Sequence, residues 1–287
     1  MPTYTSRSPP PLQLWRESPR RGRDLFSVGR VGSSDEGARD MRRLMFVLAI
    51  PLLAAPLTWG STARAAQGCT PGTSGDDYVE CSRYDDVRDG DAGDDQVYGL
   101  VGADRLNGGE GNDTIYGGIG LDMVSGDEGD DVLFGGPGND LLAADGGNDE
   151  IHGDEGDDGI SAGLGDDTID GGPGADQIKA SSGADAIVGG DGDDRIRAGS
   201  GSDLVRSGAG DDQSIAGSGD DRVFGGPGDD DIWAGRGFDR VNGGAGNDEI
   251  WTRDGVKDRI SCGAGYDVVT ADEFDRILDD CEDVVLP

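Results

Sequence analysis

Apolar and polar positions along the chain repeat with a period of nine residues from Gly93 to Ile250. An aspartate stands at every ninth position, a glycine stands two residues before each aspartate, and an aliphatic residue stands two residues after it. The aliphatic column holds Val, Leu or Ile in seventeen of its eighteen positions, and Ser214 is the exception. These three columns predict a repetitive fold, because a disordered linker would keep the composition but not the phase.

Each nonapeptide predicts one turn followed by one minimal strand. Glycine at the first, second and fourth positions permits positive φ, so the backbone can curl and aim its carbonyl groups inward. The three residues after the aspartate form the strand, and its central aliphatic side chain points inward. Two nonapeptides complete one coil, and repeats two apart stack at the strand spacing of about 4.8 Å. The strict array, residues 90–251, therefore predicts nine coils over about 43 Å, with degenerate copies at both ends.

The net charge and the amino-acid composition indicate that this fold needs a cation. The formal net charge is −35, only 34% of residues are apolar, and 54 residues are glycine. Residues 1–65 hold ten Arg and five Asp or Glu, so they contribute +5 and leave −40 for residues 66–287. Such a chain repels itself and has too little apolar surface to offset the entropy of ordering. Nucleic acid is excluded as a partner of the acidic part, because phosphate contacts need a basic face.

Calcium suits the regular spacing of the carboxylates. A calcium ion takes about six to eight oxygen ligands in flexible geometry, which fits a site shared by two stacked turns. Magnesium demands tighter geometry, and soft metals lack ligands because His152 is the only histidine. The aspartate column offers one hard anionic oxygen donor in each repeat, and its members are Asp95, Asp104, Asp113, Asp122, Asp131, Asp140, Asp149, Asp158, Asp167, Asp176, Asp185, Asp194, Asp203, Asp212, Asp221, Asp230, Asp239 and Asp248.

Individual repeats resemble a known family. Residues 108–116, GGEGNDTIY, and residues 171–179, GGPGADQIK, follow the pattern G-G-x-G-x-D-x-U-x, in which U is aliphatic. This pattern is similar to the RTX family, the haemolysin-type calcium-binding repeat, over about residues 72–286. The resemblance implies an all-β fold, a right-handed parallel β-roll with two nonapeptides per coil. It also implies that the side chains of the eighteen aspartates, together with the turn carbonyls, are the ligands of multiple Ca²⁺ ions.

The N-terminal part predicts export. Residues 41–65 have a short basic start, an apolar run and small residues before Ala66, which is typical of a cleaved signal peptide. The apolar run is too short and too interrupted by proline for a comfortable membrane span, although a membrane anchor is the alternative. Residues 1–40 are interpreted as a disordered or mis-assigned upstream extension. Residues 66–89 are expected to form an N-terminal cap, and lipoprotein cleavage before Cys69 is a further alternative.

The four cysteines flank the strict array and are expected to be oxidised in an exported chain. Disulfide Cα atoms lie within about 7 Å of each other, so bonds between opposite ends of the roll are excluded. The prediction is therefore Cys69–Cys81 and Cys262–Cys281. Residues 252–287 are expected to form degenerate repeats and a cap. There Asp258, Asp267, Asp275 and Asp283 are each followed two residues on by Ile260, Val269, Ile277 or Val285.

The sequence predicts no catalytic site. It lacks the nucleophile and metalloprotease motifs, and one histidine cannot serve both as a base and in a metal triad. The first functional hypothesis is a structural calcium-binding protein that is secreted and folds outside the cell or at its surface. The alternative is a calcium-dependent adhesin or surface-layer component that binds a glycan or protein. Its candidate residues are the outward aromatic rows, Tyr98, Tyr116 and Phe134 on one face and Trp233 and Trp251 on the other.

Two further expectations concern side chains outside the three columns. The aromatic rows have a simpler interpretation as lateral packing along the sheets. The outward arginines are expected to relieve acidic repulsion, and they are Arg195, Arg197, Arg206, Arg222 and Arg240. Ser214 removes an apolar side chain from the core, so the coils around Asp212 are predicted to be weak. A one-residue adjustment that turns Ile215 inward could restore the core there.

Overall fold

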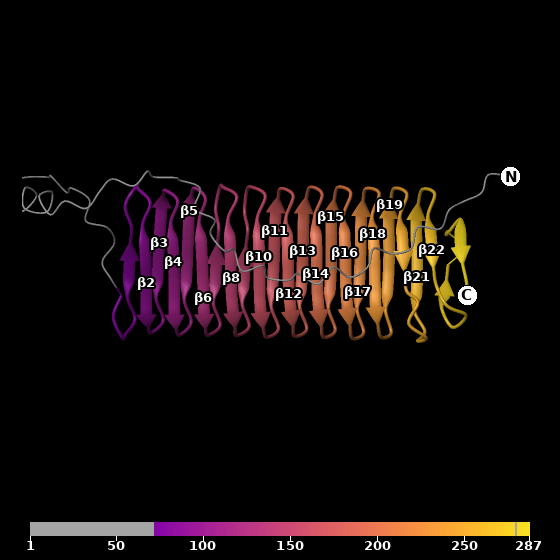
Figure 1. Ribbon diagram of the computed structural model, residues 1–287, viewed down its shortest axis with the longest axis horizontal. Helices are drawn as coiled ribbons and strands as arrows, with labels where there is room; N and C mark the ends of the chain where they lie inside the picture. Colours follow the sequence, from indigo (N-terminus) through magenta and orange to yellow (C-terminus); the bar gives the residue numbers. More distant parts are fainter. Residues whose placement is uncertain (1–71, 279) are drawn as a thin grey trace, which may run out of the picture. The chain divides into compact units, whose positions relative to one another are not determined.

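The computed structural model describes residues 72–278 and 280–287, which form a parallel β-solenoid of about twelve coils (Figure 1). Each coil contributes one strand to each of two twelve-stranded sheets. The predicted all-β roll is confirmed. The predicted extension (1–40), the signal peptide (41–65) and Cys69 lie outside the described residues. Within the described residues there is no helix long and apolar enough to cross a membrane.

Odd-numbered strands form one sheet, the odd sheet, and even-numbered strands form the other, the even sheet. The odd sheet contains β1 (Tyr78–Glu80), β3 (Gln96–Val101), β5 (Thr114–Ile119), β7 (Val132–Phe134), β9 (Glu150–His152), β11 (Thr168–Pro173), β13 (Ala186–Asp191), β15 (Leu204–Ala209), β17 (Arg222–Pro227), β19 (Arg240–Ala245), β21 (Arg259–Ala264) and β23 (Arg276–Ile277). The even sheet contains β2 (Val87–Ala92), β4 (Arg105–Glu110), β6 (Met123–Glu128), β8 (Leu141–Gly146), β10 (Gly159–Leu164), β12 (Gln177–Ser182), β14 (Arg195–Ser200), β16 (Gln213–Ser218), β18 (Asp231–Arg236), β20 (Glu249–Trp251), β22 (Val268–Thr270) and β24 (Asp283–Val285).

Most strands are longer than the predicted three residues. A typical strand such as β5 has six, because pairing continues through the first three residues of the next nonapeptide. The first glycine of the repeat therefore lies in a strand, and Gly108 does not have the positive φ that was expected of it. The second position does have positive φ, +119° at Gly109, and even Asp145 and Ser181 adopt it there.

The register confirms the stacking of repeats two apart. Val97 pairs with Ile115, eighteen residues later, and this spacing holds up to Val241. One extra residue then appears, so that Val241 pairs with Ile260. In the last coil Val269 pairs with Val284. Val285, which follows Asp283 by two residues, therefore stands one position away from this register, and all three residues of β24 are exposed.

The core consists of two inward columns. The aliphatic column is nearly completely buried, with exposed fractions of 0–3% from Val97 to Ile250. The second column comes from the first position of each nonapeptide. In the even sheet it holds alanine in every coil from Ala144 to Ala234, whereas in the odd sheet glycine predominates. Small residues on this column let the two sheets approach closely.

Ser214 keeps its place in this core. It pairs with Ile196 and Ile232 in register, and Ile215 stays on the outer surface between Arg197 and Trp233. The predicted inward turn of Ile215 was therefore wrong. The hydroxyl groups of Ser214 and Ser207 lie 2.7 Å apart across the core, and both residues are buried. A serine on the facing strand thus satisfies the buried hydroxyl of Ser214.

The C-terminal disulfide is confirmed. Cys262 on β21 is bonded to Cys281, with 5.2 Å between their Cα atoms. The bond closes a 19-residue separation, close to one coil, and ties the last coils together. Cys81 is buried and disulfide-bonded. Its pairing with Cys69 stays a prediction, because Cys69 lies outside the described residues.

Candidate metal-binding turns

The predicted aspartates each lie immediately before a strand, at the point where a turn ends. Strands of the two sheets run in opposite directions, so the aspartates form two rows along opposite edges of the roll (Figure 1). The odd row leads into the odd strands from Asp95 onward, and the even row leads into the even strands from Asp104 onward. All eighteen are 0–3% exposed. The fold therefore brings them together into ladders but buries them away from solvent.

One carboxylate oxygen of each aspartate is used within the ladder. The backbone N–H of Asp176 donates a hydrogen bond to Oδ1 of Asp194, eighteen residues later, at 2.8 Å. The carbonyl oxygen of Asp176 accepts a hydrogen bond from the N–H of Arg195 at 2.8 Å. The same pattern recurs along both rows, for example between Asp113 and Asp131. Each aspartate therefore ties its turn to the preceding coil.

The other carboxylate oxygen has no hydrogen-bond partner. Oδ2 is buried and unpaired in all eighteen predicted aspartates within the described structure. It points toward the first glycine of the repeat: a Cβ built on Gly108 would lie 2.1 Å from Oδ2 of Asp113. A buried anionic oxygen without a partner is strongly unfavourable, so these oxygens require a proton or a cation.

The raised pKa values of the repeat aspartates also show that these carboxylates need a proton or a cation. Burial raises the pKa of Asp131 and Asp194 to about 7, and repulsion from stacked aspartates adds to the effect, while the backbone hydrogen bond to Oδ1 opposes it. Burial likewise raises the pKa of Asp113 and Asp185 to about 6. At neutral pH the ladders therefore carry a poorly solvated negative charge that a bound cation would stabilise.

Two ligand candidates were missed in the sequence. Asp258 and Asp267 are buried, with an unpaired Oδ2, and they continue the odd and even rows. They were noted as part of the rhythm but not as ligands, because they follow Asp239 and Asp248 by nineteen residues rather than eighteen. The buried residues Ile260 and Val269, two positions later, were the signal that identifies them. Burial raises the pKa of Asp258 to about 8.

A second side-chain ladder was also missed. Asp or Asn often stands directly before the repeat aspartate, and its Oδ1 accepts a hydrogen bond from the next coil. The N–H of Asp130 donates to Asn112 at 2.8 Å, and the N–H of Asn148 donates to Asp130 at 2.7 Å. The two ladders run in opposite directions, so each turn is linked to both of its neighbours.

The donor set fits calcium. In the described residues no three His, Cys, Asp or Glu side chains converge on one point, so a metal would need main-chain oxygens as well. Such oxygens are present, because a Cβ built on Gly111 would lie 2.2 Å from the carbonyl oxygen of Gly93 in the preceding coil. Carboxylate and carbonyl oxygens from stacked turns are the ligands that calcium prefers.

Comparison with protein-family models gives the same answer. The RTX calcium-binding nonapeptide repeat matches in ten overlapping stretches that together span residues 71–269. The chain belongs to this family. The RTX match covers both aspartate rows, including Asp258 and Asp267, so calcium is the expected partner of these turns. No curated protein matches the sequence.

The outward aromatic side chains of this RTX roll lie stacked. The ring centroids of Tyr98 and Tyr116 are 4.7 Å apart, and those of Tyr116 and Phe134 are 4.8 Å apart. His152 continues this row at 4.8 Å, which was not foreseen. Trp233 and Trp251 stack at 4.4 Å. These are the distances of lateral cross-strand packing, and a role in partner binding stays a prediction.

Proposed function

We propose that this protein is a secreted structural protein whose RTX roll folds when calcium binds outside the cell. The observation that carries this proposal is the double row of buried carboxylates with an unpaired Oδ2. Without a cation these groups oppose folding, and with calcium they become the bonds between coils. Metal binding and folding would then be one transition.

The sequence supports export. Residues 41–65 have the pattern of a signal peptide, and cysteines that flank the array suit an oxidising exterior. Calcium is abundant outside cells, so a chain of this kind would stay unfolded during export and fold after it. N-terminal sequencing of the exported protein tests this step: a mature chain that starts at Ala66 supports it, and one that retains residues 1–40 contradicts it.

A structural role is proposed in preference to catalysis or aromatic adhesion. The buried acids are accounted for by the turns, and His152 lies in the aromatic row beside Glu150. The aromatic rows do not favour sugar binding, because neighbouring rings cover each other's faces. Tyr116 and Phe134 are nearly parallel, with an interplanar angle of 1°.

Circular dichroism tests calcium-coupled folding directly. The chain is expected to lack β-structure in chelator and to gain it in one transition as calcium is added. Magnesium at equal concentration is the control, and it should substitute poorly because it demands octahedral geometry. A chain that is already folded in chelator at neutral pH would contradict the proposal.

A further inference from the structure

Four arginines form a straight column on the outer surface of the odd sheet. Arg222, Arg240, Arg259 and Arg276 start β17, β19, β21 and β23, and each pairs in register with the next. All four are exposed, and within the described residues none forms an ion pair. Neighbouring strands lie about 4.8 Å apart, so the column spans about 14 Å.

This column is unfavourable for an isolated roll. Like charges directly opposite each other on neighbouring strands repel, and a spacing below the Debye length of about 8 Å leaves the repulsion largely unscreened. One carboxylate lies beside this surface, because Oδ2 of Asp280 accepts a hydrogen bond from the hydroxyl of Ser261, on the strand of Arg259. The other outward residues of these strands are all uncharged: Phe224, Pro227, Asn242, Ala245, Ser261 and Ala264. The protein therefore collects positive charge on one surface although its net charge is −35.

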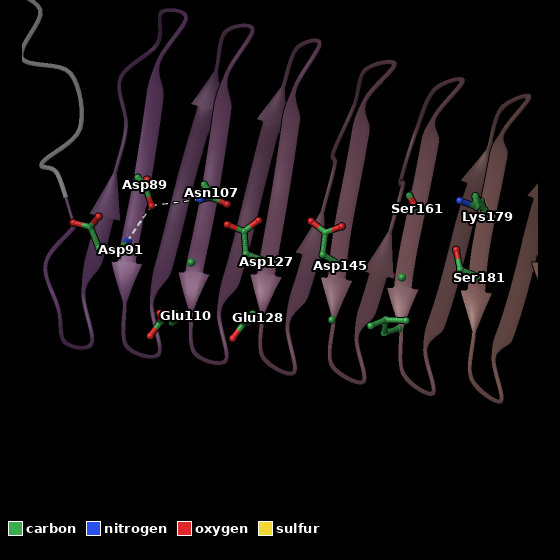
Figure 2. A pocket seen from close by; sticks show the side chains of 14 residues that line it. Asp89, Asp91, Asn107, Glu110, Asp127, Glu128, Asp145, Ser161, Lys179 and Ser181 are labelled. Atoms are coloured by element: carbon green, nitrogen blue, oxygen red, sulfur yellow. Dashed lines mark hydrogen bonds between the residues drawn. The ribbon is translucent and has the colours of Figure 1, made fainter. Parts of the chain in front are cut away.

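An acidic groove lies on the other sheet. It has a volume of about 890 Å³ and crosses the outer surface of the even sheet between β2 and β12 (Figure 2). The acids that line it are Asp89, Asp91, Glu110, Asp127, Glu128 and Asp145, and Lys179 lines its β12 end. Asp127 pairs with Asp145 in register, and Glu110 pairs with Glu128, so like charges again stand on neighbouring strands.

We propose that the arginine column of one copy docks on the acidic groove of a second copy. The two surfaces have opposite charge, and the same strand spacing sets the pitch of both, so guanidinium groups can pair with carboxylates on neighbouring strands such as Asp127 and Asp145. Guanidinium–carboxylate pairs form strong charge-assisted hydrogen bonds. Docking also relieves the repulsion within each surface, because each surface carries more charge of one sign than of the other.

The position of the two surfaces determines the kind of assembly. They lie on opposite sheets, the column toward the C-terminal coils and the groove toward the N-terminal coils. A twofold dimer would need both surfaces in one interface, and this arrangement does not allow it. The contact is therefore heterologous and leads to open-ended chains of rolls.

Sedimentation velocity of the full protein in saturating calcium tests the proposal. Wild type is expected to associate with rising concentration, and the association should weaken as NaCl is raised. The R240E/R259E variant and the D127K/D145K variant each destroy one surface. The self-association of each variant should be weaker than that of wild type by a factor of about ten or more. R195E/R197E, on β14 beside the groove strand β12, makes the same charge change as R240E/R259E outside the arginine column, and it should not weaken association because it adds negative charge next to the groove.

Mixing the two charge-reversal variants gives the decisive result. One retains an intact groove and the other an intact column, so the mixture should form a dimer that grows no further. Circular dichroism in calcium confirms that each variant is folded, which separates a failed interface from failed calcium-coupled folding. A wild type that stays monomeric overturns the proposal, as does a mixture that forms no dimer. So does a monomer whose arginine column binds polygalacturonate, which would assign the column to an anionic polysaccharide.

Discussion

The coil around Ser214 offers a quantitative test of the core. Ser214 and Ser207 share one hydrogen bond between buried hydroxyl groups at 2.7 Å. Ser214→Val adds two methyl-sized groups, worth about 1.5 kcal/mol at about 0.8 kcal/mol each. The same change leaves the hydroxyl of Ser207 buried without a partner, which costs about 1–3 kcal/mol. The single variant should therefore have nearly the stability of wild type.

The double variant separates the two effects. Ser207→Ala alone leaves Ser214 unpaired and should destabilise the roll by about 1–3 kcal/mol. With both changes no hydroxyl is left unpaired, and the apolar gain remains, so S207A/S214V should be more stable than wild type by about 1–2 kcal/mol. Each single variant leaves one hydroxyl unpaired and the double variant leaves none, so the double-mutant cycle should show a coupling of twice that cost, about 2–6 kcal/mol.

Urea unfolding in saturating calcium, followed by circular dichroism, measures these differences. Ser218→Val is the matched control, because Ser218 lies on the same strand but is exposed. It should change stability by less than about 0.5 kcal/mol. Additive effects of the two core substitutions would refute the reasoning, since the serines would then not be partners. The sequence predicted that this coil is weak. Because the hydroxyl groups of Ser207 and Ser214 are hydrogen-bonded to each other, we expect the coil to be as stable as its neighbours.

The remaining predictions concern the carboxylates and the cap. The pKa of Asp131 and Asp194 is about 7 in the folded chain, above the ordinary 3.8, so without metal the roll binds more protons than the unfolded chain. This stabilisation is fully present below about pH 4 and is lost as the pH rises through about 7, so in chelator β-structure should appear on acidification. A chain equally unfolded at pH 4.5 and pH 8 would refute this. Asp194→Asn should raise the calcium concentration needed for folding, whereas the exposed Asp193→Asn should change it less; equal shifts would argue against Asp194 as a ligand. Cys262→Ser should lower the stability of the C-terminal coils by about 2–4 kcal/mol, seen as faster proteolysis there and unchanged hydrogen exchange in the central coils.

The regular part of the fold could be predicted from the sequence, because each column of the repeat corresponds to one position in the coil. The aliphatic and aspartate columns gave the register, and Val97 pairs with Ile115 as expected. The length of the roll likewise excluded bonds between its ends and so predicted the bond between Cys262 and Cys281. These inferences needed only the period and the strand spacing.

Features that depend on contacts across the core could not be predicted in this way. The partner of Ser214 lies on the facing strand, and its position depends on how the two sheets meet. The length of the strands depends on pairing that continues through Gly108 and Gly109, which the composition alone assigned to turns. At the C-terminus irregular spacing hid the register, so Val284 rather than Val285 faces Val269.

The central claim is that calcium satisfies the buried carboxylate oxygens and thereby folds the chain. Equilibrium dialysis with radioactive calcium, run beside circular dichroism at the same calcium concentrations, tests it most directly. Binding and β-structure should rise together, and the folded chain should hold many ions, with most turns of both rows engaged. A chain that reaches full β-structure with only one or two ions bound would contradict the claim.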